Sequence, residues 1–175
     1  MIRLTIYVTS FPFCLRTAMS NLDYALLNSQ LRALLADEKD ALASASNFVA
    51  LLYNALDNVN WLGVYVLRGN ELVLGPFQGK PACVRLPVGT GVCGTAAATL
   101  STQRVADVHQ FDGHIACDAD SRSEIVVPLI TNGDLIGVLD IDSPIPDRFT
   151  ALDQQGVEGL CDTFCELQSQ RKQFI

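Results

Sequence analysis

The residue types that could carry out reaction chemistry gather in one stretch, from His109 to Asp142. A polar loop rich in aspartate holds one cysteine, Cys117, and two apolar runs follow it, joined at an Asn-Gly pair. The second run ends in two acids, Asp140 and Asp142. A thiol can attack an electrophilic atom, and a carboxylic acid can deliver a proton to the product. The stretch therefore predicts a site that combines a cysteine nucleophile with acidic side chains.

Asp140 and Asp142 are two positions apart on a predicted strand, so their side chains point to one face, about 7 Å apart. Acids are poor strand formers, so their position needs an explanation. One interpretation is a solvated strand end. The other is a pocket that binds a cation or donates a proton, because clustered carboxylates repel one another and one pKa can rise toward neutrality.

Whether Glu124 reaches these aspartates depends on the register of the predicted hairpin. In a regular hairpin with a two-residue Asn-Gly turn, Ile125 opposes Asp140. Glu124 then opposes Ile141, and its side chain faces away from both aspartates. Glu124 joins them only if a bulge shifts the register or if it lies ahead of the strand. Pro128 inside the run favours a bulge or a sheet edge.

Six cysteines in 175 residues, most of them in different settings, do not make a disulfide scaffold. Cys161 and Cys165 lie in a helical pattern and are predicted to be small core residues. Cys83, Cys93 and Cys117 lie among turns and Gly- or Asp-rich stretches. In a reducing compartment, such positions are typical of catalytic, redox-active or metal-binding cysteines.

The neighbours of Cys117 are acidic: Asp112, Asp118 and Asp120. They raise the pKa of a thiol and oppose its ionisation, so a nucleophilic Cys117 needs activation by geometry, a local donor or the substrate. The spacing of His109, His114 and Cys117 matches no strong zinc pattern, and we expect no metal. A Cys-His hydrolase pair is disfavoured in the same way.

Length and composition indicate one domain with a substantial core, since the chain has 175 residues and is 49% hydrophobic. The net charge of -7 argues against nucleic acid or an anionic membrane as a partner. Residues 1–18 weakly resemble a signal peptide, but Pro12 and Arg16 interrupt the apolar run. We expect 1–18 to be a tail outside the fold, 19–175 to form the domain, and the protein to be cytoplasmic.

Periodicity predicts an antiparallel sheet with helices packed on it. The first strand places Trp61, Gly63 and Tyr65 on one face, which either lines a pocket or packs like any other strand. Ser20 with Asp23 forms a possible capping box for the first helix, and Thr150 with Asp153 forms another for the last. The expected helices are 20–37, 40–57, one that begins near Val92 and one that begins after Thr150; the expected strands are 61–67, 72–77, 83–86, 103–105, 125–130 and 135–141.

Three segments carry a resemblance to a known family: GPFQGKPACVRLPVGTGVCGTA, DVHQFDGHIACDADSRSEIVVPL and GVLDIDS. Together they resemble the free methionine-(R)-sulfoxide reductases, which are built on a single GAF domain. The resemblance runs from about Met19 to the last helix. It implies an α+β fold with a six-stranded antiparallel sheet between helices, a homodimer, and reduction of free methionine-(R)-sulfoxide to methionine.

The resemblance also implies roles for the matching residues. The cysteine of GHIACD, Cys117, is the implied nucleophile, the cysteine of GKxACVR, Cys83, is the implied resolving thiol, and Cys93 is accessory or alternate. Glu124 and Asp140 are implied to bind the substrate ammonium, and Asp142 is a candidate acid. Trp61, with Tyr65 on the same face, is expected to contact the S-methyl group.

The chemistry expected from the resemblance agrees with the residues. A thiol attacks sulfur, a second thiol condenses with the sulfenic acid, and a thioredoxin-like dithiol reduces the disulfide. No cofactor, nucleic acid or membrane is expected to take part. The alternative function is a GAF module that binds a small ligand or senses oxidation without catalysis, but a pure sensor has no need of three loop thiols.

Overall fold

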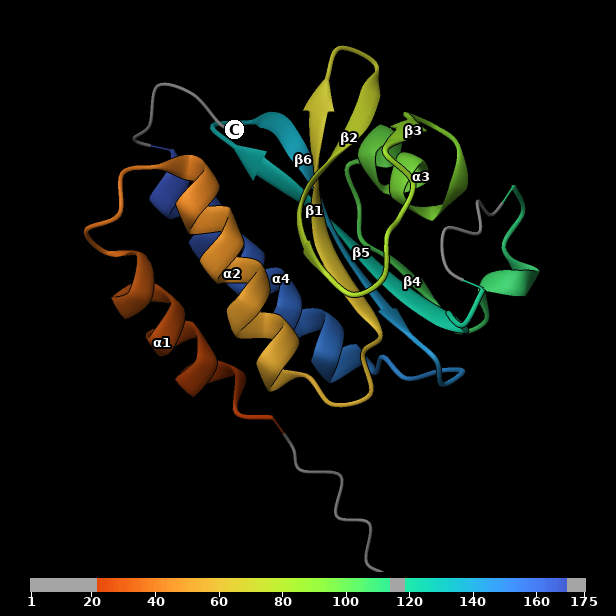
Figure 1. The fold of residues 1–175 in the computed structure, drawn as a ribbon, viewed down its shortest axis with the longest axis horizontal. Coiled ribbons are helices and arrows are strands. Elements are labelled where there is room, and N and C mark those ends of the chain that lie inside the picture. Colours follow the sequence, from red (N-terminus) through yellow and green to blue (C-terminus); the bar gives the residue numbers. More distant parts are fainter. Residues whose placement is uncertain (1–21, 114–118, 170–175) are drawn as a thin grey trace, which may run out of the picture.

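A computed structural model describes residues 22–113 and 119–169 of the chain. A six-stranded antiparallel sheet carries helices on both sides (Figure 1). Helices α1 (Tyr24–Leu35), α2 (Ala41–Ala55) and α4 (Ala151–Gln168) lie on one side, and α3 (Gly91–Thr99) lies on the other. The strands are β1 (Trp61–Arg68), β2 (Glu71–Gln78), β3 (Arg85–Pro87), β4 (Gln103–Val105), β5 (Ser123–Thr131) and β6 (Asp134–Ser143), and a short 3-10 helix, η1 (Val108–Gln110), follows β4. No helix in these ranges is long and apolar enough to cross a membrane.

The strand order is β3-β2-β1-β6-β5-β4, so β1 and β6 lie at the centre of the sheet. Both sides of these two strands are covered by helices, and the predicted fold class is confirmed. On β1, the aliphatic residues Leu62, Val64 and Val66 face the large core formed with α1, α2 and α4. A stacked pair of rings, Phe48 and Phe164, joins α2 to α4 with centroids 4.5 Å apart.

The two expected capping boxes have different outcomes. Thr150 and Asp153 form the predicted box at the start of α4. At α1, Asp23 is itself the N-cap and accepts a hydrogen bond from the Leu26 backbone, and Ser20 lies outside the described residues, as does the 1–18 tail. Leu152, in the first turn of α4, is 70% exposed and lies at the rim of a cavity.

Strand β2 contains a bulge at Gly75-Pro76. The pairing of β1 with β2 shifts by one residue between Gly63 and Tyr65, opposite these two residues. A proline removes a ladder hydrogen bond, so β2 accommodates it where the ladder is already interrupted.

The contact between α1 and α4 depends on a glycine. A Cβ atom built on Gly156 would lie 2.2 Å from Cγ of Tyr24, whose hydroxyl donates a 2.7 Å hydrogen bond to Asp153. We expect Gly156→Ala to lower the free energy of unfolding by about 1–3 kcal/mol, because the ring cannot move without breaking that bond. Chemical denaturation followed by circular dichroism measures the change.

Gly159 provides a matched control one turn further along the same helix. A Cβ atom there meets nothing within 4 Å. Gly159→Ala should therefore gain up to about 1 kcal/mol from helix propensity alone. Equal effects of the two substitutions would contradict a packing role for Gly156.

Candidate functional site

The register of the β5–β6 hairpin decides which acids share a face. The pairing shifts by one residue between Leu129 and Ile130, so Glu124 pairs with Asp142. The regular register, with Glu124 opposite Ile141, is therefore wrong, and the bulge considered as an alternative is present. Since paired residues of a sheet point to the same face, Glu124 joins both aspartates on the α3 side.

A buried cluster of three ionisable side chains forms on this side of the sheet. Cys93 comes from α3, Glu124 from β5 and Asp140 from β6, and they are 5%, 5% and 6% exposed. Sγ of Cys93 donates to Oε1 of Glu124 at 3.9 Å, and one donor atom from each residue lies within 4.8 Å of the others. Oδ1 of Asp140 is buried and has no hydrogen-bond partner among the described residues. The interpretation of Asp140 as a solvated strand end is therefore wrong.

Burial controls the protonation of the cluster. It raises the pKa of Glu124 well above its ordinary value, and the charges of Asp140 and Asp142 raise it further. Burial raises the pKa of the Cys93 thiol in the same way, with Asp140 and Glu124 adding to the effect. Burial raises the pKa of Asp140 to about 6. Hydrogen bonds with Cys93 and Glu124 lower this pKa and so keep the rise from being larger. Near neutral pH the cluster holds protons on Cys93 and Glu124 and a charge on Asp140.

An aromatic group forms the floor beside the acids. Trp61 pairs with Asp142 across the strands, and its ring stacks on Phe77 and Tyr65 at centroid distances of 5.5 and 5.8 Å. A Cβ atom at Gly63 would lie 2.5 Å from Cη2 of Trp61, so only glycine leaves room for this ring. Sequence reasoning missed Phe77, because its contact with Trp61 depends on the pairing of β1 with β2.

The polar atoms of the two predicted aromatics hold the segment that carries Cys83. Nε1 of Trp61 donates to the Lys80 carbonyl at 3.0 Å, and the hydroxyl of Tyr65 donates to the Cys83 carbonyl at 3.0 Å. Burial, with Asp140 the largest electrostatic contributor, raises the pKa of Tyr65, so the hydroxyl keeps its proton and remains a donor. The rings are thus oriented by bonds to the loop rather than by bonds to solvent.

The cysteines fall into distinct settings. Cys83 is disulfide-bonded, whereas Cys93, Cys161 and Cys165 are free, so its partner is none of these three. Cys161 and Cys165 are buried in the core of α4, as predicted. The predicted nucleophile, Cys117, lies outside the described residues, together with His114 of the disfavoured metal set.

The cluster offers two kinds of chemistry. The protonated groups can donate protons, and the Asp140 oxygen that has no partner in the described part of the chain can accept a hydrogen bond from a cation. By spacing alone, the donor atoms of Cys93, Glu124 and Asp140 could also ligate a metal ion, but the thiol and carboxyl protons would first have to leave.

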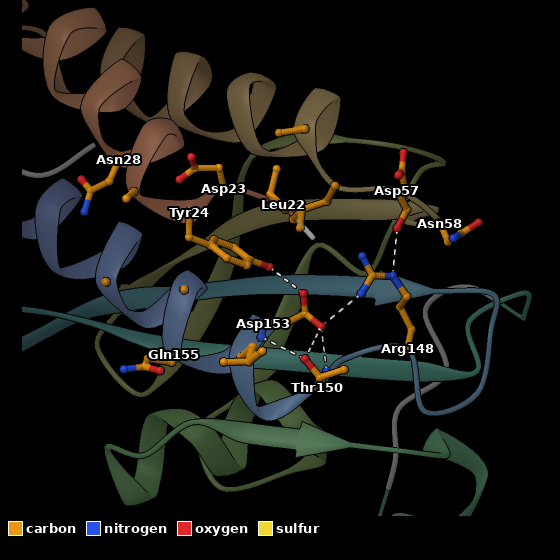
Figure 2. A pocket seen from close by; sticks show the side chains of 16 residues that line it. Leu22, Asp23, Tyr24, Asn28, Asp57, Asn58, Arg148, Thr150, Asp153 and Gln155 are labelled. Carbon is orange, nitrogen blue, oxygen red and sulfur yellow. Dashed lines mark hydrogen bonds and ion pairs between the residues drawn. The ribbon is translucent and has the colours of Figure 1, made fainter. Parts of the chain in front are cut away.

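A separate cavity of about 700 Å³ lies among the ends of α1, α2 and α4, on the other side of the sheet (Figure 2). Asp153 accepts hydrogen bonds from Tyr24 and Thr150 and an ion pair from Arg148. Nε of Arg148 also donates to the Asp57 carbonyl at 2.9 Å. Among the described residues no cysteine lines this cavity, and its polar contacts hold the start of α4 in place, so we assign it a structural role.

The fold and a family match define the class of protein. The GAF domain family matches residues 25–165. The chain is 58% identical over 137 residues to the free methionine-R-sulfoxide reductase of Escherichia coli (strain K12), covering 78% of this chain and 83% of that protein. It is 48% identical over 124 residues to the enzyme of the same name from Saccharomyces cerevisiae, covering 68% of this chain and 69% of that one.

Solved structures agree with this match. The reduced form of fRMsr of Staphylococcus aureus has a TM-score of 0.82 and 53% identity, covering 85% of this chain and 96% of that one. The free methionine-R-sulfoxide reductase of Neisseria meningitidis, in complex with its substrate, has a TM-score of 0.80 and 41% identity, covering 84% and 90%. This chain is therefore a GAF-domain protein. It belongs to the free methionine-R-sulfoxide reductase family, as the sequence resemblance indicated.

The raised pKa of Asp140 gives stability a defined pH dependence. A carboxyl with a pKa of 3.8 when unfolded and about 6 when folded binds more protons in the folded state over that interval. The free energy of unfolding therefore falls as the pH rises from about 4 through about 6. Asp140→Asn removes this loss, so its melting temperature should rise relative to the wild type between pH 4 and pH 7, by the equivalent of about 1–3 kcal/mol.

Asp134→Asn is the control, because Asp134 is exposed at the opposite end of the same strand. Its melting temperature should stay parallel to that of the wild type across the range. A constant offset between Asp140→Asn and the wild type at every pH would show that Asp140 titrates as an ordinary surface acid.

Proposed function

We propose that this protein reduces free methionine-(R)-sulfoxide to methionine, with Cys117 as the nucleophile and Cys83 as the resolving thiol. The observation that carries the proposal is the buried cluster of Cys93, Glu124 and Asp140 beside a disulfide-bonded Cys83. A thiol-based reduction of a sulfoxide needs proton donors at the oxygen and a second thiol at hand. Family membership supports the same reaction.

The free amino acid fits the polar side of the site. Its α-ammonium is a cation with several donors, and Asp140 presents a buried oxygen without a hydrogen-bond partner among the described residues. Glu124 and Asp142 pair across the strands beside it. Charge-assisted hydrogen bonds to these carboxyl groups would bind the ammonium, while Trp61 and Tyr65 would pack against the S-methyl group.

The proposed reaction balances in three steps. The Cys117 sulfur bonds to the sulfoxide sulfur while one proton reaches the oxygen. The hydroxyl then passes to the Cys117 sulfur as the substrate S–O bond and the transient S–S bond break, which releases methionine and leaves a sulfenic acid on Cys117. The Cys83 thiol then displaces that oxygen as water and forms a disulfide. A thioredoxin-like dithiol reduces the disulfide by exchange and is itself oxidised.

We assign the proton donor to the pair formed by Glu124 and Asp142. The sequence made Asp142 a candidate acid and left the donor open. Burial raises the pKa of Glu124 well above its ordinary value, and Glu124 and Asp142 are directly opposite each other. Cys93 is the accessory thiol: its raised pKa disfavours a nucleophilic role, and its hydrogen bond orients Glu124.

We propose that the protein acts as a homodimer. A non-catalytic sensor would not explain a disulfide-bonded cysteine whose carbonyl is held by Tyr65 and whose loop is held at Lys80 by Trp61.

Because Cys117 and Cys83 have different proposed roles, replacing each with serine should impair the reaction in a different way. Cys117→Ser should abolish methionine release from free methionine sulfoxide. Cys83→Ser should release about one equivalent and then stop, because the sulfenic acid has no resolving partner. Methionine is quantified by chromatography, first without and then with a thioredoxin system.

Cys161→Ala, in the core of α4, is the matched cysteine control and should turn over normally. Steady turnover by Cys117→Ser would refute the assignment of the nucleophile. A bridge between Cys83 and Cys117, found by peptide mass spectrometry after one turnover, is the expected product.

Selectivity for the free amino acid follows from the ammonium contacts. In N-acetylmethionine sulfoxide the charge is lost and buried carboxyl groups stay unpaired, at a cost of about 1–3 kcal/mol, or roughly five- to one-hundred-and-fifty-fold in affinity. Trp61 is the single tryptophan of the chain, so its emission in Cys117→Ser reports binding without turnover. Chiral chromatography of mixed epimers should show that the R epimer disappears and the S epimer remains. Equal affinity for the blocked substrate would refute the ammonium site.

A further inference from the structure

An ion pair links the two loops that carry the proposed catalytic and resolving cysteines. Nζ of Lys80 contacts the carboxylate of Asp120. Lys80 lies three residues before Cys83, and Asp120 lies three residues after Cys117. The ion pair and the proposed disulfide are therefore three residues apart on both loops, so the ion pair joins the two loops close in sequence to both cysteines.

Buried side chains hold both ends of this ion pair to the sheet. On one side, the Lys80 carbonyl accepts the Trp61 indole hydrogen bond at 3.0 Å. On the other, Ser121, which is buried, accepts a 3.1 Å hydrogen bond from the side chain of Asn60 through its Oγ atom. Asn60 and Trp61 are adjacent on the chain, so both loops are hydrogen-bonded to the same place, the start of β1.

We propose that Lys80 and Asp120 are positioning residues for the resolving step, an inference that rests on the proposed function of Cys117 and Cys83. In that step the Cys83 sulfur bonds to the Cys117 sulfur, the S–O bond of the sulfenic acid breaks, and the oxygen leaves as water with the thiol proton. A disulfide forms only when the two Cα atoms lie about 4.4–6.8 Å apart. Holding the loops in one register keeps Cys83 within that reach.

The effect is expected to be modest, because Lys80 and Asp120 are 61% and 64% exposed. An exposed ion pair changes an equilibrium by about two- to five-fold at most, and reversing one charge adds repulsion. The influence should fall on capture of the sulfenic acid and not on its formation, since neither residue is assigned to the substrate.

The test measures how the sulfenic acid divides between two fates. Reduced protein receives one equivalent of free methionine-(R)-sulfoxide in the presence of dimedone, which traps sulfenic acids. Peptide mass spectrometry then gives the ratio of the dimedone adduct on Cys117 to the disulfide. Lys80→Glu and Asp120→Lys should each raise this ratio about two- to five-fold, and the double variant with both reversals should restore the wild-type ratio. Methionine released in the first turnover should be unchanged.

Arg85 and Glu71 provide the matched control. They form an ion pair of similar exposure, 61% and 50%, but it joins strands β2 and β3, which are already hydrogen-bonded. Arg85→Glu should leave the trapping ratio at the wild-type value. Wild-type ratios in both Lys80→Glu and Asp120→Lys, or a double variant no better than the single ones, would overturn the proposal. Absence of any Cys117 adduct in Cys83→Ser would instead refute the proposed function.

Discussion

The one-residue bulge in the β5–β6 hairpin is the constraint on which the site depends. Side chains alternate along a strand, so a shift of one residue exchanges the two faces of β5 relative to β6. With the bulge, Ile125 pairs with Ile141 in the helix-covered core, and Glu124 pairs with Asp142 on the α3 side. Without it, an isoleucine would stand opposite an aspartate. The same irregularity thus satisfies the core and assembles the acids.

The position of these acids in the sheet explains their unusual protonation. β6 is a central strand, so Asp140 has neighbours on both sides and α3 above it. Removing a carboxylate from water disfavours its charged form, and a second carboxyl group nearby adds to that penalty. The protein keeps the cluster by protonating part of it: Cys93 donates to Glu124, and Asp140 carries the charge. A buried site of this kind is prepared for a cationic ligand and for proton transfer.

The aromatic residues connect this cluster to the cysteine loop. The rings of Trp61 and Tyr65 pack in the core on the α3 side of the sheet. The indole N–H of Trp61 donates to the Lys80 carbonyl, and the hydroxyl of Tyr65 donates to the Cys83 carbonyl. The two side chains that we propose as substrate contacts therefore also hold the backbone of Lys80 and Cys83. In the proposed function, binding, proton donation and disulfide formation all depend on β1 and its two neighbouring strands.

The sequence by itself determined the fold class, the order of the elements and the identity of the candidate residues. Hydrophobic periodicity located the central strands closely, because burial on a fixed face leaves a period that local sequence retains. Motif resemblance selected Cys83, Cys93, Glu124 and the aspartates. The tertiary structure decided the register of β5 on β6, the burial of Asp140 and the contact of Phe77 with Trp61. All three features depend on how strands pair and on packing from both sides of the sheet, which local sequence does not determine. A hairpin with Asn-Gly at its turn can form a regular or a bulged ladder, and only burial of the correct face in the core selects one of them.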